Sequence, residues 1–144
     1  MTDSIGYLLN DAARLFRRAF DANTRDLGVT GLQWRIIARL NHQPGLRQSQ
    51  LADYLEVEPI TLSRMIDRLA DAELVERRPD PGDRRAWQIY LTKKAEPLKN
   101  EMYRRADIII KEALQGLSEE EKTVLNTLVD RVRANLSRKQ SCND

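Results

Sequence analysis

Apolar residues recur at the three- and four-residue spacing of an amphipathic helix along four stretches of the chain. The first stretch reaches about Leu27, and its apolar positions are Ile5, Leu8, Leu9, Ala12, Leu15, Phe16, Ala19 and Phe20. The second runs from Leu32 to about Asn41, the third follows Thr92, and the fourth runs from Val124 to Leu136. This pattern predicts long helices at both ends of the chain.

Local signals mark where these helices begin and end. Thr30–Gln33 and Ser118–Glu121 each place a hydroxyl three residues before Gln or Glu, which is the capping-box pattern. Gly28 is predicted to end the first helix. Thr92 is predicted to cap the third helical stretch, which extends to Gly116. The residues from 137 to 144 are polar and are predicted to form a frayed tail.

The elements between residues 48 and 92 are shorter. Gln48–Leu55 and Pro59–Leu69 predict two short helices joined by a tight turn. Ala86–Thr92 alternates between apolar and polar residues, as a strand does, and Leu74–Pro79 provides its partner. The intervening Asp-Pro-Gly-Asp-Arg-Arg sequence, residues 80–85, contains the turn-forming residues of a hairpin. Two short helices followed by a basic hairpin describe a winged helix-turn-helix.

The second short helix has a buried stripe and a polar outer face. Leu62, Met65, Ile66 and Leu69 fall within about 100° of arc. The outer face contains Ile60, Ser63, Arg64 and Asp67, with Thr61 and Arg68 at its edge. Pro59 suits the first helical turn, where its missing N–H is not needed. Small, polar and basic residues at this end are typical of a recognition helix in the major groove, although a solvated surface gives the same pattern.

The hairpin tip adds a second basic feature. Arg84 and Arg85 are adjacent there, and arginines at such a tip suit the narrow, electronegative minor groove. Asp83 is predicted to pair with the Arg85 guanidinium and hold it in place. A solubilising loop is the alternative interpretation. The predicted DNA-binding residues are Pro59, Thr61, Ser63, Arg64, Arg68, Asp83, Arg84 and Arg85.

The order of these motifs resembles the MarR family of bacterial transcription regulators. The motifs are Gln33-Trp34, Gln48-x-x-Leu51-Ala52, Thr61-x-Ser63-Arg64, Asp67-Arg68-Leu69, Leu74-Val75-x-Arg77, Asp83-Arg84-Arg85-Ala86 and Leu91-Thr92. The resemblance covers about residues 5–137, and the Lys-Ala-Glu-Pro run after Thr92 is similar to the branch that includes SlyA. Two residues depart from the pattern. Glu73 replaces the glycine that usually ends the recognition helix, and Arg47 replaces a Ser or Thr N-cap.

The resemblance implies a mostly α-helical fold with a small β-hairpin wing. A winged helix-turn-helix core is flanked by long N- and C-terminal dimerisation helices. The expected domains are residues 1–29 for the N-terminal dimerisation helix, 30–92 for the DNA-binding domain, and 93–144 for the C-terminal dimerisation helices and polar tail. The apolar stripes of the terminal helices exceed what a winged domain of about 60 residues can cover, so a symmetric homodimer is expected.

The functional expectation is a sequence-specific transcription regulator. As a dimer it would bind a palindromic operator in double-stranded DNA, acting as a ligand-responsive repressor. The resemblance also implies a small aromatic effector, with Trp34 as a candidate wall of its site. Packing against a neighbouring helix is the other interpretation of Trp34. The alternative function is a winged-helix module for protein–protein interaction that does not bind DNA.

Composition narrows the remaining possibilities. The net charge of +2 is too small to mark a nucleic-acid binder, so a cationic site must be local. With one histidine, His42, and one cysteine, Cys142, we find no catalytic residues, metal ligands or cofactor motif, and we expect no enzyme. Cys142 has no partner for an internal disulfide and no neighbours that favour a redox switch. The first residues lack a secretory signal, and no apolar run approaches the roughly 20 residues of a membrane span. We therefore expect a cytoplasmic protein.

Overall fold

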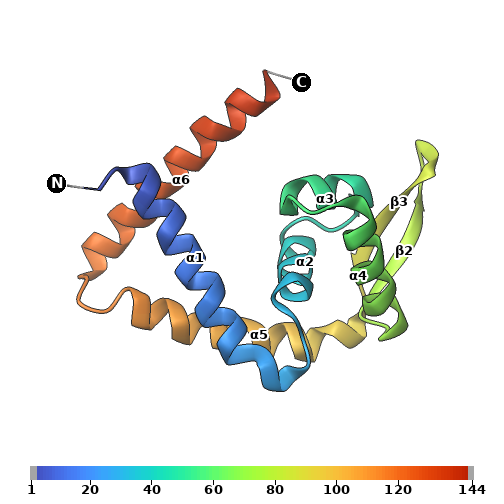
Figure 1. The fold of residues 1–144 in the computed structure, drawn as a ribbon, viewed down its shortest axis with the longest axis horizontal. Coiled ribbons are helices and arrows are strands. Elements are labelled where there is room, and N and C mark those ends of the chain that lie inside the picture. Colours follow the sequence, from blue (N-terminus) through green and yellow to red (C-terminus); the bar gives the residue numbers. More distant parts are fainter. Residues whose placement is uncertain (1–2, 143–144) are drawn as a thin grey trace. The chain divides into compact units, whose positions relative to one another are not determined.

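The computed structural model describes residues 3–142 (Figure 1). These residues divide into two units, the first ending at Ile109 and the second beginning at Ile110. The helices of the first unit are α1 (Ile5–Thr24), α2 (Gly31–His42), α3 (Gln48–Leu55) and α4 (Pro59–Asp71), with a short 3-10 turn η1 (Arg25–Leu27). Its strands are β1 (Leu46–Arg47), β2 (Val75–Asp80) and β3 (Asp83–Leu91). A second 3-10 turn, η2 (Lys93–Ala95), leads into α5 (Glu96–Ala113), which crosses the boundary, and α6 (Glu119–Ser141) lies in the second unit.

The helix starts predicted at Thr30 and Ser118 are confirmed, and α1 also begins with a side-chain cap. Ser4 Oγ accepts a hydrogen bond from the Tyr7 N–H at 3.3 Å. Thr30 and Gln33 form both bonds of a capping box, at 3.0 and 3.2 Å. Ser118 does the same with Glu121, at 2.9 and 3.1 Å. These contacts satisfy backbone N–H groups that have no partner inside the helix.

The core of the first unit lies between α2, α3, α4, β3 and α5. Its fully buried side chains include Ile36, Ile37, Leu40, Leu51, Leu62, Ile66, Ile89 and Met102. Each buried aliphatic side chain of this size contributes about 1.5–3 kcal/mol relative to exposure. The inner stripe predicted for α4 is confirmed, since Leu62, Ile66 and Leu69 are buried and Met65 is partly buried. The opposite face of α4 is therefore turned towards solvent.

The sheet is antiparallel in the order β1-β3-β2. Val75 pairs with Leu91 at the base of the hairpin, and Pro79 pairs with Trp87 towards its end. Figure 1 shows β2 and β3 continuing beyond the helices as a wing. The third strand, β1, is only two residues long and was not predicted, because it is defined by the pairing of Leu46 with Ile89 rather than by its own sequence.

Several boundaries differ from the prediction. Thr92 does not cap the following helix with its side chain. Its hydroxyl donates to the Glu73 carbonyl at 2.5 Å, and η2 precedes α5. The helix ends at Ala113, before Gly116. The polar segment predicted to fray is helical through Ser141, while residues 143 and 144 lie outside the described part of the chain. Glu73, which stands where the family pattern has glycine, adopts a left-handed backbone conformation with a φ of 61°.

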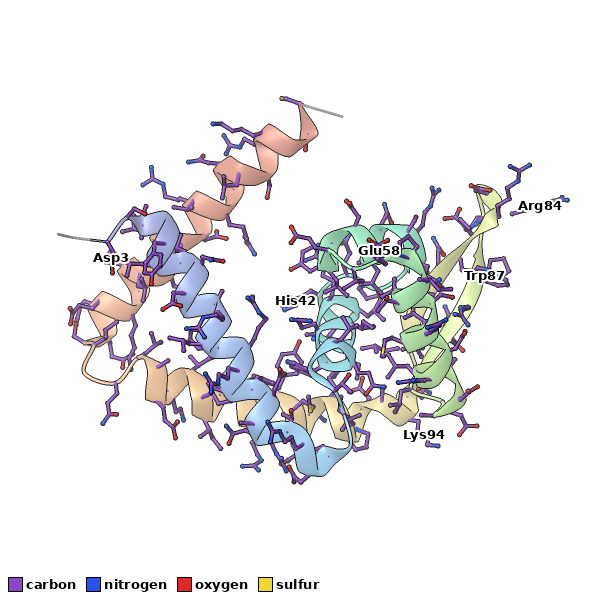
Figure 2. All side chains as sticks on the ribbon, viewed as in Figure 1. Asp3, His42, Glu58, Arg84, Trp87 and Lys94 are labelled. Carbon is purple, nitrogen blue, oxygen red and sulfur yellow. The ribbon has the colours of Figure 1, made fainter. Side chains whose placement is uncertain are left out.

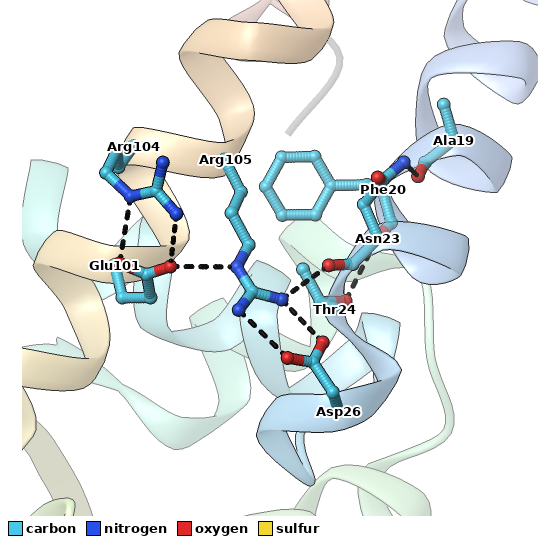
Figure 3. Close-up of polar contacts among 8 residues, drawn as sticks. All are labelled: Ala19, Phe20, Asn23, Thr24, Asp26, Glu101, Arg104 and Arg105. Atoms are coloured by element: carbon cyan, nitrogen blue, oxygen red, sulfur yellow. Dashed lines mark hydrogen bonds and ion pairs between the residues drawn. The ribbon is translucent and has the colours of Figure 1, made fainter.

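One arginine joins the end of α1 to α5 (Figure 3). Arg105 forms two bonds with Asp26, at 2.5 and 2.9 Å, and donates from Nη1 to the Asn23 carbonyl at 2.7 Å. Its Nε donates to Glu101 at 3.0 Å. Hydrogen bonds from Arg104 and then Arg105 lower the pKa of Glu101 to about 2, and the bond from Arg105 lowers the pKa of Asp26. Asp26 thus joins Arg105 of α5 to the segment that follows α1, and Glu101 holds the Arg105 guanidinium from the same helix.

Within residues 3–142, no helix combines the length and apolar character needed to cross a membrane.

Candidate nucleic-acid interface

The outer face of α4 is available to a partner. Pro59, Thr61, Arg64 and Arg68 are exposed, and Ser63 is half-buried. Pro59 occupies the first turn, as predicted, and the preceding Glu58 makes no side-chain cap. The N-terminal N–H groups of α4 therefore carry the positive end of the helix dipole. A helix end with these properties suits base edges and backbone phosphates.

The wing turn is held by an ionised aspartate. Asp80 is 8% exposed, and its Oδ1 accepts a hydrogen bond from the Gly82 N–H at 2.8 Å. Its Oδ2 accepts from Arg47 Nε, also at 2.8 Å. The bond from Gly82, followed by that from Arg47, lowers the pKa of Asp80. The turn is thus fixed by a carboxylate that stays charged at neutral pH.

The two wing arginines point into solvent. Arg84 and Arg85 are exposed, and Figure 2 shows Arg84 projecting from the end of the wing. Among the ion pairs formed by residues 3–142, none involves Arg64, Arg84 or Arg85. These three guanidinium groups are therefore available to neutralise phosphates or to read bases.

The predicted role of Asp83 needs correction. Its Oδ1 accepts a hydrogen bond from the backbone N–H of Arg85 at 2.9 Å. The expected ion pair with the Arg85 guanidinium is not found in the described part of the chain. An aspartate two residues before its backbone donor forms a local turn that competes well with other contacts. Asp83 therefore shapes the backbone of the turn and leaves the Arg85 side chain free.

Sequence reasoning missed the residues that hold the wing to the helices. Arg77 on β2 forms an ion pair with Asp67 on α4, with 2.7 Å between Nη2 and Oδ1. It also donates from Nε to Gln48 Oε1 at 3.2 Å. Arg77 is part of the motif pattern, but its partner Gln48 is 29 residues away along the chain. No local spacing indicates such a contact.

The comparisons with known proteins agree with this geometry. The model of the MarR family matches residues 29–87, which include α2 to α4 and most of the wing. The transcriptional regulator PA3341 is 32% identical to the chain, with a TM-score of 0.79, and the match covers 94% of this chain and 99% of that one. The chain belongs to the MarR family. The regulator SlyA is 26% identical over 99% of this chain and 100% of its own, with a TM-score of 0.79. Wild-type MarR from E. coli has the same fold, with 22% identity, coverage of 92% and 98%, and a TM-score of 0.80.

Membership in the MarR family implies DNA-binding transcription regulation. The winged helix-turn-helix is the part of the chain that the family model matches, and it contains all eight predicted DNA-binding residues. Regulators of this family are generally not enzymes.

Trp34, the predicted effector contact, is mainly a packing residue in this MarR-family chain. It is 8% exposed, stacks on Phe20 at 5.3 Å between ring centroids, and meets Tyr103 edge-on at 5.0 Å. The three rings join α1, α2 and α5. Trp34 also lines a pocket of about 140 Å³, together with Phe16, Arg17, Phe20, Asp21, Gly31 and Arg35. That volume is below the roughly 300 Å³ at which ligand pockets usually begin.

Proposed function

We propose that the chain is a ligand-responsive repressor that binds a palindromic operator in double-stranded DNA as a homodimer. The observation that carries the proposal is a group of exposed arginines on two elements that form no ion pair among residues 3–142. Arg64 lies on the outer face of α4, and Arg84 and Arg85 lie at the end of the wing. A net charge of only +2 makes this local grouping more informative than the overall composition.

The two elements would read different parts of the duplex. The first turns of α4 enter the major groove, where Pro59, Thr61, Ser63, Arg64 and Arg68 reach base edges and phosphates. The wing follows the backbone into the adjacent minor groove, where Arg84 and Arg85 meet its negative potential. Asp83 contributes indirectly by fixing the turn through its bond to the Arg85 N–H.

Exposed apolar faces on the terminal helices support the homodimer. Ile5 and Leu8 on α1 are 68% and 47% exposed, and Ile110 on α5 is 43% exposed. On α6 the whole apolar stripe is exposed, and it consists of Val124, Leu125, Leu128, Val129, Val132 and Leu136. A second copy would cover these faces, and its winged unit would read the second half-site. Half-sites would then lie about one helical turn apart, roughly 10 bp.

The effector part of the proposal rests on the chemistry of the pocket beside Trp34. Phe16, Phe20 and Trp34 give this pocket aromatic walls that suit a small aromatic molecule, and its volume of about 140 Å³ would have to increase for such a molecule to bind. Binding there would act on α1 and α2, which meet at the stacked rings of Phe20 and Trp34. As a transcription regulator with its single cysteine unpaired, the protein would act in the bacterial cytoplasm.

Footprinting on genomic fragments that include the promoter of its own gene tests the proposal. We expect two symmetric protected half-sites about 10 bp apart. If the dimer neutralises about 6–10 phosphates, affinity should fall about 10³- to 10⁵-fold between 50 and 200 mM salt. Transcription in vitro should decrease when the site is occupied. Absence of specific protection on every fragment would favour the alternative, a winged-helix module for protein–protein interaction.

A further inference from the structure

The guanidinium of Arg77 joins three elements of the winged unit. Arg77 lies on β2, and its side chain is 25% exposed. Its Nη2 is 2.7 Å from Asp67 Oδ1 and 3.4 Å from the carbonyl oxygen of Ser63, and both acceptors belong to α4. Its Nε donates to Gln48 Oε1, on the first residue of α3, at 3.2 Å. One side chain thus connects the wing to both helices of the helix-turn-helix.

A second polar contact, from Arg47 to Asp80, joins the start of α3 to β2 closer to the wing turn. Arg47, which precedes Gln48, donates to Asp80 Oδ2 at 2.8 Å. Asp80 in turn accepts the backbone bond from Gly82 in the wing turn. Two neighbouring residues therefore contact β2 at two points, since Gln48 accepts a bond from Arg77 and Arg47 donates to Asp80. The angle between the wing and the helices is determined by these bonds as well as by the core beneath them.

We infer that Arg77 is a positioning residue for DNA recognition, holding the wing and α4 at the separation that both grooves require at once. This inference rests on the proposed function. The planar guanidinium can reach acceptors on α4 and α3 simultaneously, whereas a lysine ammonium lacks that rigid fork. Arg77 acts through Asp67 and Gln48, because its Nε and Nη2 donors already face protein acceptors.

A substitution at Asp67 can distinguish the positioning role of Arg77 from simple charge repulsion between the protein and the DNA backbone. Its side chain is 59% exposed on the recognition helix, where a negative charge repels the phosphate backbone. If it were only a surface carboxylate, the neutral isostere Asp67→Asn would strengthen DNA binding. If it anchors Arg77, the same substitution weakens binding, because the wing is no longer held at the correct angle. The sign of the effect therefore decides between the two roles.

The experiment compares Asp67→Asn, Arg77→Lys and the double variant with the wild type, on an operator found by wild-type footprinting. Glu58→Gln is the matched control, because Glu58 is an exposed carboxylate beside α4 without an ion pair among residues 3–142. Affinity is measured at a temperature where circular dichroism shows every variant folded. We expect Asp67→Asn and Arg77→Lys each to weaken binding about tenfold, with the double variant weakened by little more. Glu58→Gln should bind as tightly as the wild type or more tightly.

Footprints supply a readout that a general loss of stability would not produce. Methylation of guanine in the major groove should remain protected in Asp67→Asn, because α4 still docks. Hydroxyl-radical protection by the wing should be reduced. Tighter binding by Asp67→Asn, unchanged wing protection, or equal loss of both protections would each overturn the inference while leaving the proposed function standing. If the wild type itself protects no operator, the proposed function fails and this inference fails with it.

Discussion

Leu128 offers a direct test of the proposed homodimer. It lies in the middle of the exposed stripe of α6 and is 50% exposed. Because full burial of a leucine contributes about 1.5–3 kcal/mol, covering its exposed half contributes about 0.75–1.5 kcal/mol in each copy. Leu128→Glu removes this contribution twice in a symmetric dimer and places two carboxylates in an apolar interface, which adds a further cost. The apolar loss alone is about 1.5–3 kcal/mol, or about 10- to 150-fold in the dissociation constant of the dimer, and the cost of the carboxylates adds to it.

Sedimentation velocity over a range of concentrations measures this change. At micromolar concentration, the mass of the wild type from sedimentation should be twice the chain mass of 16.7 kDa. The mass of Leu128→Glu should shift towards that of one chain. Asn126→Glu is the control, because Asn126 is exposed on the polar side of the same helix. It adds the same charge and should leave the dimer intact. A monomeric wild type, or a Leu128→Glu protein with undiminished dimer mass, would refute the reasoning.

Three further predictions concern stability and the wing. Because the pKa of Glu101 is lowered from 4.5 to about 2, its stabilising effect is complete above pH 4.5 and is lost as the pH falls towards 2. The urea midpoint of unfolding should therefore fall less in Glu101→Gln than in the wild type as the pH is lowered from 4.5 towards 2. An equal fall in the two proteins would argue against the assigned ion pairs. Trp34→Ala should lower the free energy of unfolding by about 3–5 kcal/mol in urea titrations, and a loss below about 1 kcal/mol would exclude the packing role. Asp83→Ala should weaken DNA binding less than Arg85→Ala in gel shifts, because the guanidinium remains and only the turn is loosened. Equal losses would contradict this order.

Structural features that depend only on residues a few positions apart in the sequence could be predicted. The capping boxes at Thr30 and Ser118 depend on residues three apart, and both formed as expected. The buried stripe of α4 follows from helical periodicity, and the left-handed backbone at Glu73 follows from the position where a helix must end. The motif order also identified the family.

What could not be predicted depends on contacts between distant residues. The strand β1 exists because Leu46 pairs with Ile89, and Arg105 meets Asp26 across 79 residues. The bond from Arg47 to Asp80 and the contacts of Arg77 likewise follow from the tertiary fold. The prediction for Asp83 was wrong because a backbone N–H two residues away competes with the flexible guanidinium and needs no ordering of a long side chain. These distant contacts hold the wing against the helices.

In the proposed function, α4 reads base sequence while the wing supplies affinity from the minor groove. A binding profile over a randomised operator library, measured for the wild type, Arg64→Ala and Arg85→Ala, tests it most directly. Arg64→Ala should weaken binding and relax the preference at one position in each half-site, by about 1–3 kcal/mol if the contact is bidentate to guanine. Arg85→Ala should weaken binding to all related operators by a similar factor and leave the half-site preference unchanged. If Arg85→Ala altered the half-site preference while Arg64→Ala only scaled affinity, the roles of helix and wing would be reversed. If neither variant changed binding, α4 would not be the recognition helix.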